Sequence, residues 1–285
     1  MENPKYNDLT PEEEYVIIRK GTERPGTGEY NKHDEEGIYI CRQCNSPLYF
    51  SHDKFNSHCG WPSFDDEIPG AVKRNIDADG RRVEIVCQNC EGHLGHVFEG
   101  ERFTAKNARH CVNSLSMSFV PQNETNLERV LLASGCFWGK QFNYDRLDGV
   151  VATRVGFTGG SRPNPTSMEV SSGKTGHAET VEVIFDKTKT NAETILKYFF
   201  ETHDPSVIER QGENSGGKYR SAIFYTNDEQ KATAEKLIQA LKEKGLNAAT
   251  QLGEAFTFYS AENKHQKYYD KLEKEPERPY FEKRF

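Results

Sequence analysis

The sequence has 285 residues, of which 35% are hydrophobic and 28% are charged, a balance typical of a globular protein. This length allows two ordinary domains. The net charge is −7, and residues 1–125 contain 14 Lys and Arg against 21 Asp and Glu, whereas residues 126–285 contain 23 of each kind. An acidic first part repels phosphate backbones, which argues against nucleic acid as a partner.

No segment is long and apolar enough to predict a membrane span, so no membrane partner is expected. The first twenty residues lack a basic start followed by an apolar run, and therefore predict no signal peptide. We expect a cytoplasmic protein, from which a leader can still have been trimmed. Seven cysteines is an odd number, and their arrangement in pairs and singles indicates metal ligands and reactive thiols rather than a disulfide framework.

Short strand-like segments separated by turn signals fill the first part of the chain and predict a small all-β domain over residues 1–121. These segments lie within residues 37–44, 77–87, 95–103 and 114–120. A linker is predicted at residues 122–128, because Pro121 ends a strand-like run and polar residues follow it.

Strand-like and helix-like patterns alternate over residues 129–285 and predict an α/β (α+β) domain. Their order contains a split β-α-β-β-α-β core. The predicted strands are 130–133, 150–157, 180–186, 220–225 and 249–254, and the predicted helices are 137–147, 191–202, 228–244 and a last stretch near 261–273. Gly245 is the expected end of the third helix.

Cys41 and Cys44 form one Cys-x-x-Cys pair, and Cys87 and Cys90 form a second. Together they supply four thiolates, which make a closed tetrahedral shell for zinc. Because a closed shell leaves no open position, the pattern predicts one structural Zn²⁺ per chain, and no organic cofactor is expected. A redox-active Cys-x-x-Cys pair is the alternative, disfavoured because two matching pairs are present and a small β domain needs a metal to stabilise it.

Two cysteines of the first domain remain, Cys59 and Cys111. Arg109 and His110 precede Cys111 and favour its thiolate form. Asn113 follows two residues later and, on a strand, points to the same side as Cys111. These neighbours make Cys111 a candidate reactive thiol.

His93 and His96 are candidates for proton transfer, because an imidazole titrates near neutral pH. They also follow Cys90 closely in the sequence. A structural role beside the zinc site is therefore an equally good interpretation of both.

Cys136 is followed by no further cysteine. It lies between a predicted strand and a predicted helix, where unpaired amide N–H groups and the helix dipole favour an anion and lower the pKa of a thiol. A buried, inert cysteine is the alternative. The glycines on both sides and the two neighbouring aromatic residues, Phe137 and Trp138, favour a reactive thiol.

Six motifs of the first domain resemble those of the B-type peptide methionine sulfoxide reductases, over residues 8–121. They are GTERPGTGEY, CRQC, CGWPSF, CQNC, GHLGHVF and RHCVNS. The resemblance implies that Cys111 is the nucleophile, that Cys59 is the resolving cysteine and that the four paired cysteines bind zinc. It also implies that the sulfoxide pocket and its proton donors are formed by Trp61, His93, His96 and Asn113.

The second domain resembles the A-type enzymes from residue 129 to about 275, through GCFWG, GKTGHAE and KYRSAIF. This resemblance implies that Cys136 is the nucleophile and that Phe137 and Trp138 enclose the substrate methyl group. It further implies that Glu179 is the general acid and that Tyr219 hydrogen-bonds the sulfoxide oxygen.

The two resemblances together imply reduction of both epimers of methionine sulfoxide, R by the first domain and S by the second. A thiolate that attacks the sulfoxide sulfur needs a proton for the oxygen, and the product is a cysteine sulfenic acid. For Glu179 this requires a raised pKa, which burial against the aromatic residues supplies. The expected partners are oxidised proteins or peptides and a thioredoxin- or glutaredoxin-type reductant.

Three features depart from the A-type pattern. Ser167 stands where a second tyrosine is usual, and Asn214, a substrate-binding candidate, stands where an aspartate is usual. The tail lacks the resolving cysteines that are common in this family. Cys136 must therefore be resolved by an external thiol or by a cysteine of the first domain.

Two other functions use similar residues. One is a zinc-ribbon binding module fused to a different thiol enzyme, and the other is a thiol peroxidase or disulfide oxidoreductase. Supplying dithiothreitol with either hydrogen peroxide or methionine sulfoxide, and measuring which is consumed, separates these functions from sulfoxide reduction.

Overall fold

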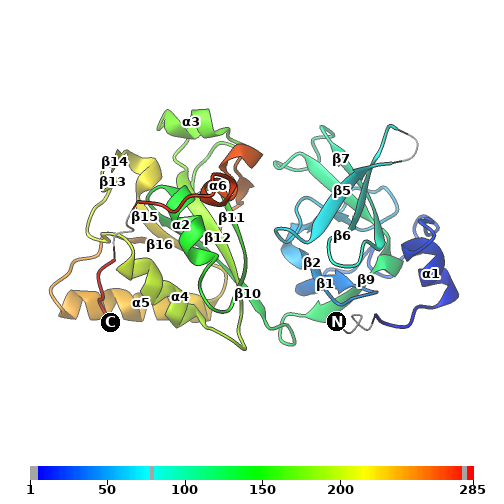
Figure 1. Cartoon of the computed structure of the whole chain (residues 1–285), viewed down its shortest axis with the longest axis horizontal. Helices are drawn as coiled ribbons and strands as arrows, with labels where there is room; N and C mark the ends of the chain where they lie inside the picture. Colours follow the sequence, from blue (N-terminus) through cyan, green and yellow to red (C-terminus); the bar gives the residue numbers. More distant parts are fainter. Residues whose placement is uncertain (1–5, 78–79, 278–280) are drawn as a thin grey trace. The chain divides into compact units, whose positions relative to one another are not determined.

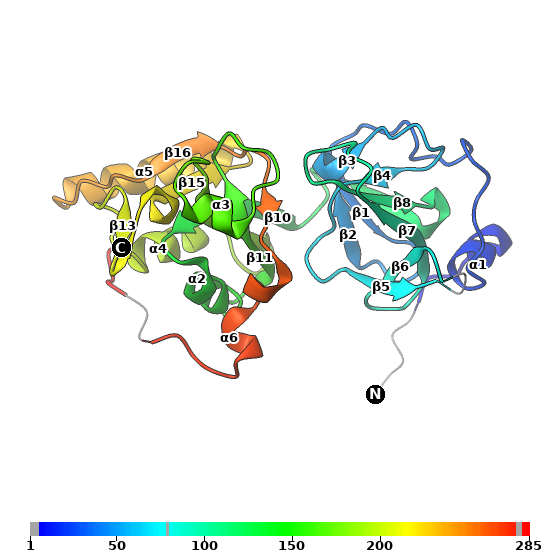
Figure 2. The ribbon, with the colours of Figure 1, turned by 90° about the horizontal axis from the view of Figure 1, so that it is seen from above.

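The computed structural model describes residues 6–77, 80–277 and 281–285. The chain forms two compact units, Met1–Thr125 and Asn126–Phe285 (Figures 1 and 2). The last strand of the first unit ends at Pro121, and the first strand of the second begins at Leu127, inside the predicted linker. Among the described residues, no helix has both the length and the apolar character needed to cross a membrane.

The first unit contains a three-stranded and a six-stranded antiparallel sheet. The three-stranded sheet has the order β2-β1-β9 and comprises β1 (Gly37–Cys41), β2 (Pro47–Phe50) and β9 (Met117–Pro121). The six-stranded sheet has the order β3-β4-β8-β7-β6-β5 and comprises β3 (Lys54–Phe55), β4 (Ser63–Phe64), β5 (Val72–Ile76), β6 (Val83–Cys87), β7 (His93–Glu99) and β8 (Ala108–Val112). Fully buried rings of Tyr39, Tyr49 and Phe64 pack between them. The predicted β fold of this unit is confirmed; residues 78–79 of one predicted segment lie outside the described residues.

One helix of this unit, α1 (Pro11–Ile17), was not predicted. Its start carries a capping box: the Glu13 amide donates to the Thr10 hydroxyl at 3.3 Å, and the Thr10 amide donates to the Glu13 carboxylate at 2.8 Å. Its buried side chains, Val16 and Ile17, attach it to the β core. The Thr-Pro-Glu-Glu sequence was the signal for this helix. Two short 3₁₀ turns complete the unit, η1 (Ser51–Asp53) and η2 (Ser114–Ser116).

The second unit is built on a six-stranded sheet of order β16-β15-β10-β12-β11-β17. Its strands are β10 (Leu127–Ser134), β11 (Val150–Thr158), β12 (Ala178–Asp186), β15 (Ser221–Tyr225), β16 (Gln251–Glu254) and β17 (Tyr259–Ser260). Within it, β10, β11, β12 and β15 are antiparallel neighbours, with α2 (Phe137–Tyr144) after β10 and α4 (Ala192–Glu201) after β12. The predicted split β-α-β-β-α-β core is confirmed.

The helices α4 and α5 (Asp228–Glu243) pack side by side (Figure 1). Each begins at an asparagine cap, Asn191 or Asn227, whose side chain accepts an amide N–H of the first turn. Gly245, with φ of +86°, ends α5 as predicted. The buried stripe of α4 includes Phe199 and Phe200, each of which contributes roughly 1.5–3 kcal/mol by burial.

The remaining elements of the second unit are short and lie mainly in its loops. They are α3 (Ser167–Ser171), β13 (Arg210–Gln211), β14 (Asn214–Ser215), η3 (Gly217–Tyr219), η4 (Asn263–His265) and α6 (Tyr268–Lys271). The last predicted helix, near 261–273, is thus divided into a 3₁₀ turn and one turn of α-helix. The helix α2 ends at Tyr144, three residues before its predicted end at 147.

Candidate redox and metal sites

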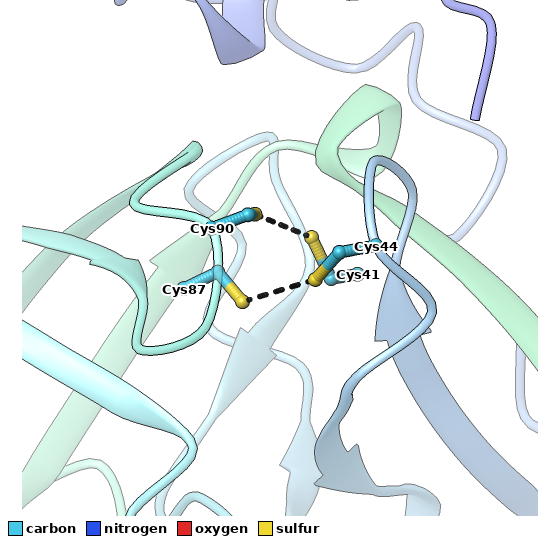
Figure 3. Close-up of side chains that lie close together, drawn as sticks. All are labelled: Cys41, Cys44, Cys87 and Cys90. Carbon is cyan, nitrogen blue, oxygen red and sulfur yellow. Dashed lines mark hydrogen bonds between the residues drawn. The ribbon is translucent and has the colours of Figure 1, made fainter. Parts of the chain in front are cut away.

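Four cysteine sulfurs of the first unit converge on one point (Figure 3). The Sγ atoms of Cys41, Cys44, Cys87 and Cys90 all lie within 4.8 Å of one another, with Cys41–Cys90 and Cys44–Cys87 separations of 3.6 Å. Tetrahedral ligands at a Zn–S distance of about 2.3 Å lie about 3.8 Å apart, so this spacing fits zinc. Hydrogen bonding to neighbouring sulfurs and burial raise the pKa of Cys41. A metal cation bound between the four sulfurs would lower the pKa of the thiols instead.

The two Cys-x-x-Cys turns have the same local geometry. In each, the residue after the second cysteine has a positive φ, +60° at Asn45 and +59° at Glu91, and its amide donates to the carbonyl of the first cysteine at 2.9 Å. Each turn follows a sheet strand, β1 or β6, so the fold brings together pairs that are far apart in sequence.

A second sulfur pair lies at the other candidate site of the first unit. Cys111 lies on β8, directly opposite His96 of β7 and Ser63 of β4. Gly95 permits the close approach of the strands, since a Cβ there would lie 2.0 Å from the Cys111 carbonyl oxygen. A cavity of about 120 Å³ opens at this point. It is lined by Thr22, Trp61, Arg82, Gly95, His96, Phe98, Cys111 and Asn113.

The sulfurs of Cys59 and Cys111 lie 3.6 Å apart, within hydrogen-bonding distance of each other. The hydrogen bond from Cys111 lowers the pKa of Cys59 to about 4, with the hydroxyls of Ser57 and Ser63 acting in the same direction. The same contact, together with burial, raises the pKa of Cys111. This contact therefore favours the thiolate at Cys59, whereas Arg109 favours it at Cys111, as the sequence predicted.

Of the two residues that precede Cys111, Arg109 acts on it as predicted and His110 does not. Because side chains alternate along a strand, His110 points to the opposite face, where it is fully buried and hydrogen-bonds the Tyr49 hydroxyl at 3.2 Å. The positive charge of Arg109 lowers the pKa of Cys111. The Arg109 guanidinium donates to the Glu101 carboxylate at 2.7 and 2.9 Å, which holds it in place. Only Arg109 favours the thiolate.

The two histidines lie together although they are three residues apart on β7. A register irregularity opposite Ile85 and Val86 brings their rings to 5.6 Å, whereas a regular strand would point them to opposite faces. His93 is buried, its Nδ1–H donates to the Glu84 carboxylate 2.8 Å away, and burial lowers the pKa of His93. His96 lines the cavity and contacts Asp77 at 2.8 Å. Neither carboxylate partner was identified from the sequence.

The backbone of Glu23 holds Trp61 and Asn113 at the cavity wall. The Trp61 indole N–H donates to the Glu23 carbonyl at 3.1 Å, and the Asn113 side chain accepts the Glu23 amide at 3.1 Å and donates to the Leu94 carbonyl at 3.0 Å. The buried Glu23 carboxylate accepts the amides of Ser114 and Leu115 at 2.8 and 3.2 Å. Glu23, absent from the sequence-based candidates, thus holds two residues of the cavity wall, Trp61 and Asn113, in place.

In the second unit, Cys136 is the cap residue of α2, as its place between strand and helix predicted. Gly135, with φ of +99°, makes the sharp turn out of β10. The next amide, that of Phe137, donates to the Glu179 carboxylate at 3.3 Å, which places the candidate acid beside the start of the helix. Glu179 lies on β12 and is 7% exposed.

The effect of burial on the pKa of Cys136 is larger than the effect of the helix terminus. Burial and the neighbouring Glu179 raise the pKa of Cys136 to about 11, although the Trp138 amide, Lys218 and Lys140 act in the opposite direction. The prediction of a lowered pKa is therefore wrong. Burial raises the pKa of Glu179 as predicted. Both groups hold their protons more tightly than they would in water.

The tail of the chain packs on the aromatic pair beside Cys136. The Trp138 ring stacks on Tyr268 with centroids 3.9 Å apart, and its indole N–H donates to His265 at 3.2 Å. The buried Phe137 ring lies 5.8 Å from the rings of Phe157 and His265. The tail that lacks a cysteine therefore positions Trp138.

Tyr219 lies on η3 beside Lys218, whose ammonium is 4.5 Å from the tyrosine ring centroid and 3.0 Å from Glu179 Oε1. Asn214 lies exposed on β14, and within the described residues its side chain has no hydrogen bond to Cys136 or Glu179. Ser167 donates to Glu262 at 2.8 Å. The structure thus brings Lys218 to the acid, and not Asn214.

Comparison with known proteins assigns both units. The model of the peptide methionine sulfoxide reductase family matches residues 128–284, and the SelR domain, the B-type reductase domain, matches residues 9–121. The chain belongs to the peptide methionine sulfoxide reductases. It joins a B-type domain to an A-type domain, in that order, as the motifs predicted.

Individual relatives of the reductase agree with this assignment. The B-type domain is 58% identical over 118 residues to peptide methionine sulfoxide reductase B2, chloroplastic, of Arabidopsis thaliana, covering 41% of this chain and 58% of that protein. It is 53% identical over 120 residues to B5 of the same plant, covering 42% and 86%. The A-type domain resembles Mxr1 of Saccharomyces cerevisiae in reduced form, with 28% identity, a TM-score of 0.51, and coverage of 56% and 93%.

Proposed function

We propose that this reductase converts both epimers of methionine sulfoxide in oxidised proteins and peptides to methionine, R in the B-type domain and S in the A-type domain. The observation that supports this most directly is that each matched domain holds a partly buried cysteine beside groups able to carry a proton. A sulfoxide sulfur is chiral, so two differently built sites serve its two hands.

In the B-type domain, Cys111 is proposed as the nucleophile because it lines the cavity, whereas Cys59 does not. The Cys59 thiolate, 3.6 Å away, accepts the Cys111 proton as the attack begins. His96, which also lines the cavity, and His93 behind it deliver a proton to the oxygen. Trp61 and Asn113 are proposed to orient the substrate.

The step balances without an external reagent. The oxygen moves from the methionine sulfur to the Cys111 sulfur, so methionine is reduced by two electrons and the cysteine is oxidised to a sulfenic acid. The Cys59 thiol then displaces the hydroxyl group as water and forms a disulfide. An external dithiol of the thioredoxin type reopens it by exchange.

In the A-type domain, Cys136 is proposed as the nucleophile, Glu179 as the acid, and Phe137 and Trp138 as the walls around the methyl group. Tyr219 is proposed as a second hydrogen-bond donor to the oxygen. Only the position of Asn214 in the family pattern, where an aspartate is usual, supports it as a substrate-binding residue, because the described residues show no hydrogen bond from its side chain to Glu179 or Cys136. With no cysteine in the tail, an external thiol, of glutaredoxin or thioredoxin type, reduces the sulfenic acid of Cys136.

We also propose that Cys41, Cys44, Cys87 and Cys90 hold one structural Zn²⁺. The sulfur separations of 3.6 Å and the identical turns support four-sulfur coordination. The ion would join β1 to β6 and so connect the two sheets of the B-type domain. A cytoplasmic location stays part of the proposal, although the B2 relative of Arabidopsis thaliana is named as chloroplastic.

The two domains are expected to divide the epimers between them. Replacing Cys111 by Ser should abolish R-epimer turnover and leave S-epimer turnover unchanged, and Cys136→Ser should do the reverse. The measurement is reduction of separated R and S methionine sulfoxide peptides with dithiothreitol. Loss of both activities from either single change would contradict independent sites, and consumption of hydrogen peroxide in place of sulfoxide would favour a peroxidase.

Replacing Glu179 by Gln keeps the shape of the side chain and removes its proton. The S-epimer rate should fall by about 10²–10⁴, the usual contribution of a general acid. R-epimer turnover by the same protein is the internal control. An S-epimer rate within a few-fold of the unaltered protein would assign the proton to Tyr219 or to water.

Metal analysis of freshly purified protein should find one zinc per chain. Replacing Cys41 and Cys44 together by Ser should remove the metal and lower the melting temperature of the B-type domain, because binding free energy at such a site is also folding free energy. Replacing Cys59 by Ser is the matched control and should retain the zinc. Zinc retained after the double change would refute the four-sulfur site.

A further inference from the structure

Among the described residues, Lys218 is the cation that forms an ion pair with Glu179, the proposed acid of the A-type site. Its ammonium contacts Glu179 Oε1 at 3.0 Å, while the other carboxylate oxygen, Oε2, accepts the Phe137 amide at 3.3 Å. Both side chains are withdrawn from water, with 17% of the lysine side chain and 8% of the glutamate side chain exposed. Such an ion pair is much less screened than one on the surface.

The surroundings hold the ammonium in place. It lies 4.5 Å from the Tyr219 ring centroid and 3.0 Å from the Ser171 hydroxyl on α3. The η3 turn that carries Lys218 also carries Tyr219, so one short element brings a cation and a phenol to the acid.

We propose that Lys218 is a positioning residue that sets the pH range of S-epimer reduction, because its single charge acts on both Glu179 and Cys136. The inference rests on the proposed roles of these two residues. Removal of the charge affects them in the same direction: the carboxylate and the thiolate each lose a stabilising cation, and each therefore gains a proton more readily.

The other charged groups around the site do not replace Lys218. Lys140, four residues after Cys136 on α2, also acts on the thiol, but burial lowers its own pKa to about 8, and it donates to the Thr202 carbonyl. Tyr269 faces Cys136 as a neutral phenol whose pKa burial raises. The pKa of Glu179 is raised by burial and lowered only by Lys218 and the Phe137 amide.

Lys218 lowers the pKa of both Glu179 and Cys136, so its removal raises both. In Lys218→Met, the pKa of the acid and the pKa of the thiol both rise, so both limbs of the pH profile for S-epimer kcat/KM should move to higher pH. An opposite charge 3.0 Å from a carboxylate shifts its pKa by about one unit or more. The pH optimum of S-epimer reduction should therefore move to higher pH.

The experiment compares the unaltered full-length protein with Lys218→Met, Lys218→Arg and Lys242→Met. Lys242 is an exposed lysine of α5, so its variant has the same change in net charge at a distance from the site. The Met variant at 218 should shift the profile, whereas Lys218→Arg and Lys242→Met should keep the original optimum. R-epimer profiles should be the same in all four proteins.

A second measurement does not depend on turnover. Alkylation of Cys136 is followed against pH by mass spectrometry of its peptide, and Lys218→Met should need a higher pH for half-maximal reaction. An unchanged profile and unchanged alkylation in Lys218→Met would overturn the inference, as would equal shifts in Lys242→Met. Absence of S-epimer turnover in the unaltered protein would instead refute the proposed function, and the alkylation result would still decide the role of Lys218.

Discussion

A cysteine sulfur held beside a proton-carrying group, largely out of water, is the constraint on which both domains depend. Burial makes the charged form of a thiol or a carboxyl costly, so each site needs nearby donors before the charged form can appear. In the B-type domain the donor to Cys59 is the Cys111 thiol, 3.6 Å away. In the A-type domain the partners are Lys218 and the first amide of α2, which converge on Glu179.

This difference separates the two halves chemically. At one site a second thiol lies 3.6 Å from the proposed nucleophile, where it is proposed to accept the proton and later to form the disulfide. At the other site Cys136 has no second cysteine in its domain, and its surroundings supply a carboxyl and an ammonium instead. The tail contains no cysteine, but it has a structural role, since Tyr268 and His265 position Trp138.

Motif spacing was sufficient to predict the four-cysteine cluster, the split β-α-β-β-α-β core and the burial of Glu179. The helix α1 was missed because its capping box was not weighed against the many strand signals around it. The pKa shifts of Cys59 and Cys111 were beyond the sequence, since they depend on a 3.6 Å contact between a loop residue and a residue of β8. At Cys136, the helix end was visible in the sequence, but the larger effect of burial was not.

Other side chains became visible only through pairing between strands. His93 and His96 share one face of β7 because of an irregularity in its register with β6, which no spacing rule predicts. His110 and Arg109 are adjacent in sequence, yet alternation along β8 sends one into the core and leaves the other to act on Cys111. Lys218 was not predicted as a site residue, because only the fold shows that its ammonium contacts Glu179.

The central claim is that Cys111 reacts with Cys59 as its partner and that Cys136 reacts without a second cysteine. The most direct test follows each sulfur through a single oxidation. Reduced full-length protein is treated with one equivalent of R or S sulfoxide without reductant, trapped with a sulfenic-acid reagent and digested for mass spectrometry. The account predicts a Cys59–Cys111 disulfide after the R epimer and a labelled Cys136 sulfenic acid after the S epimer. A disulfide between Cys136 and either Cys59 or Cys111 would contradict it.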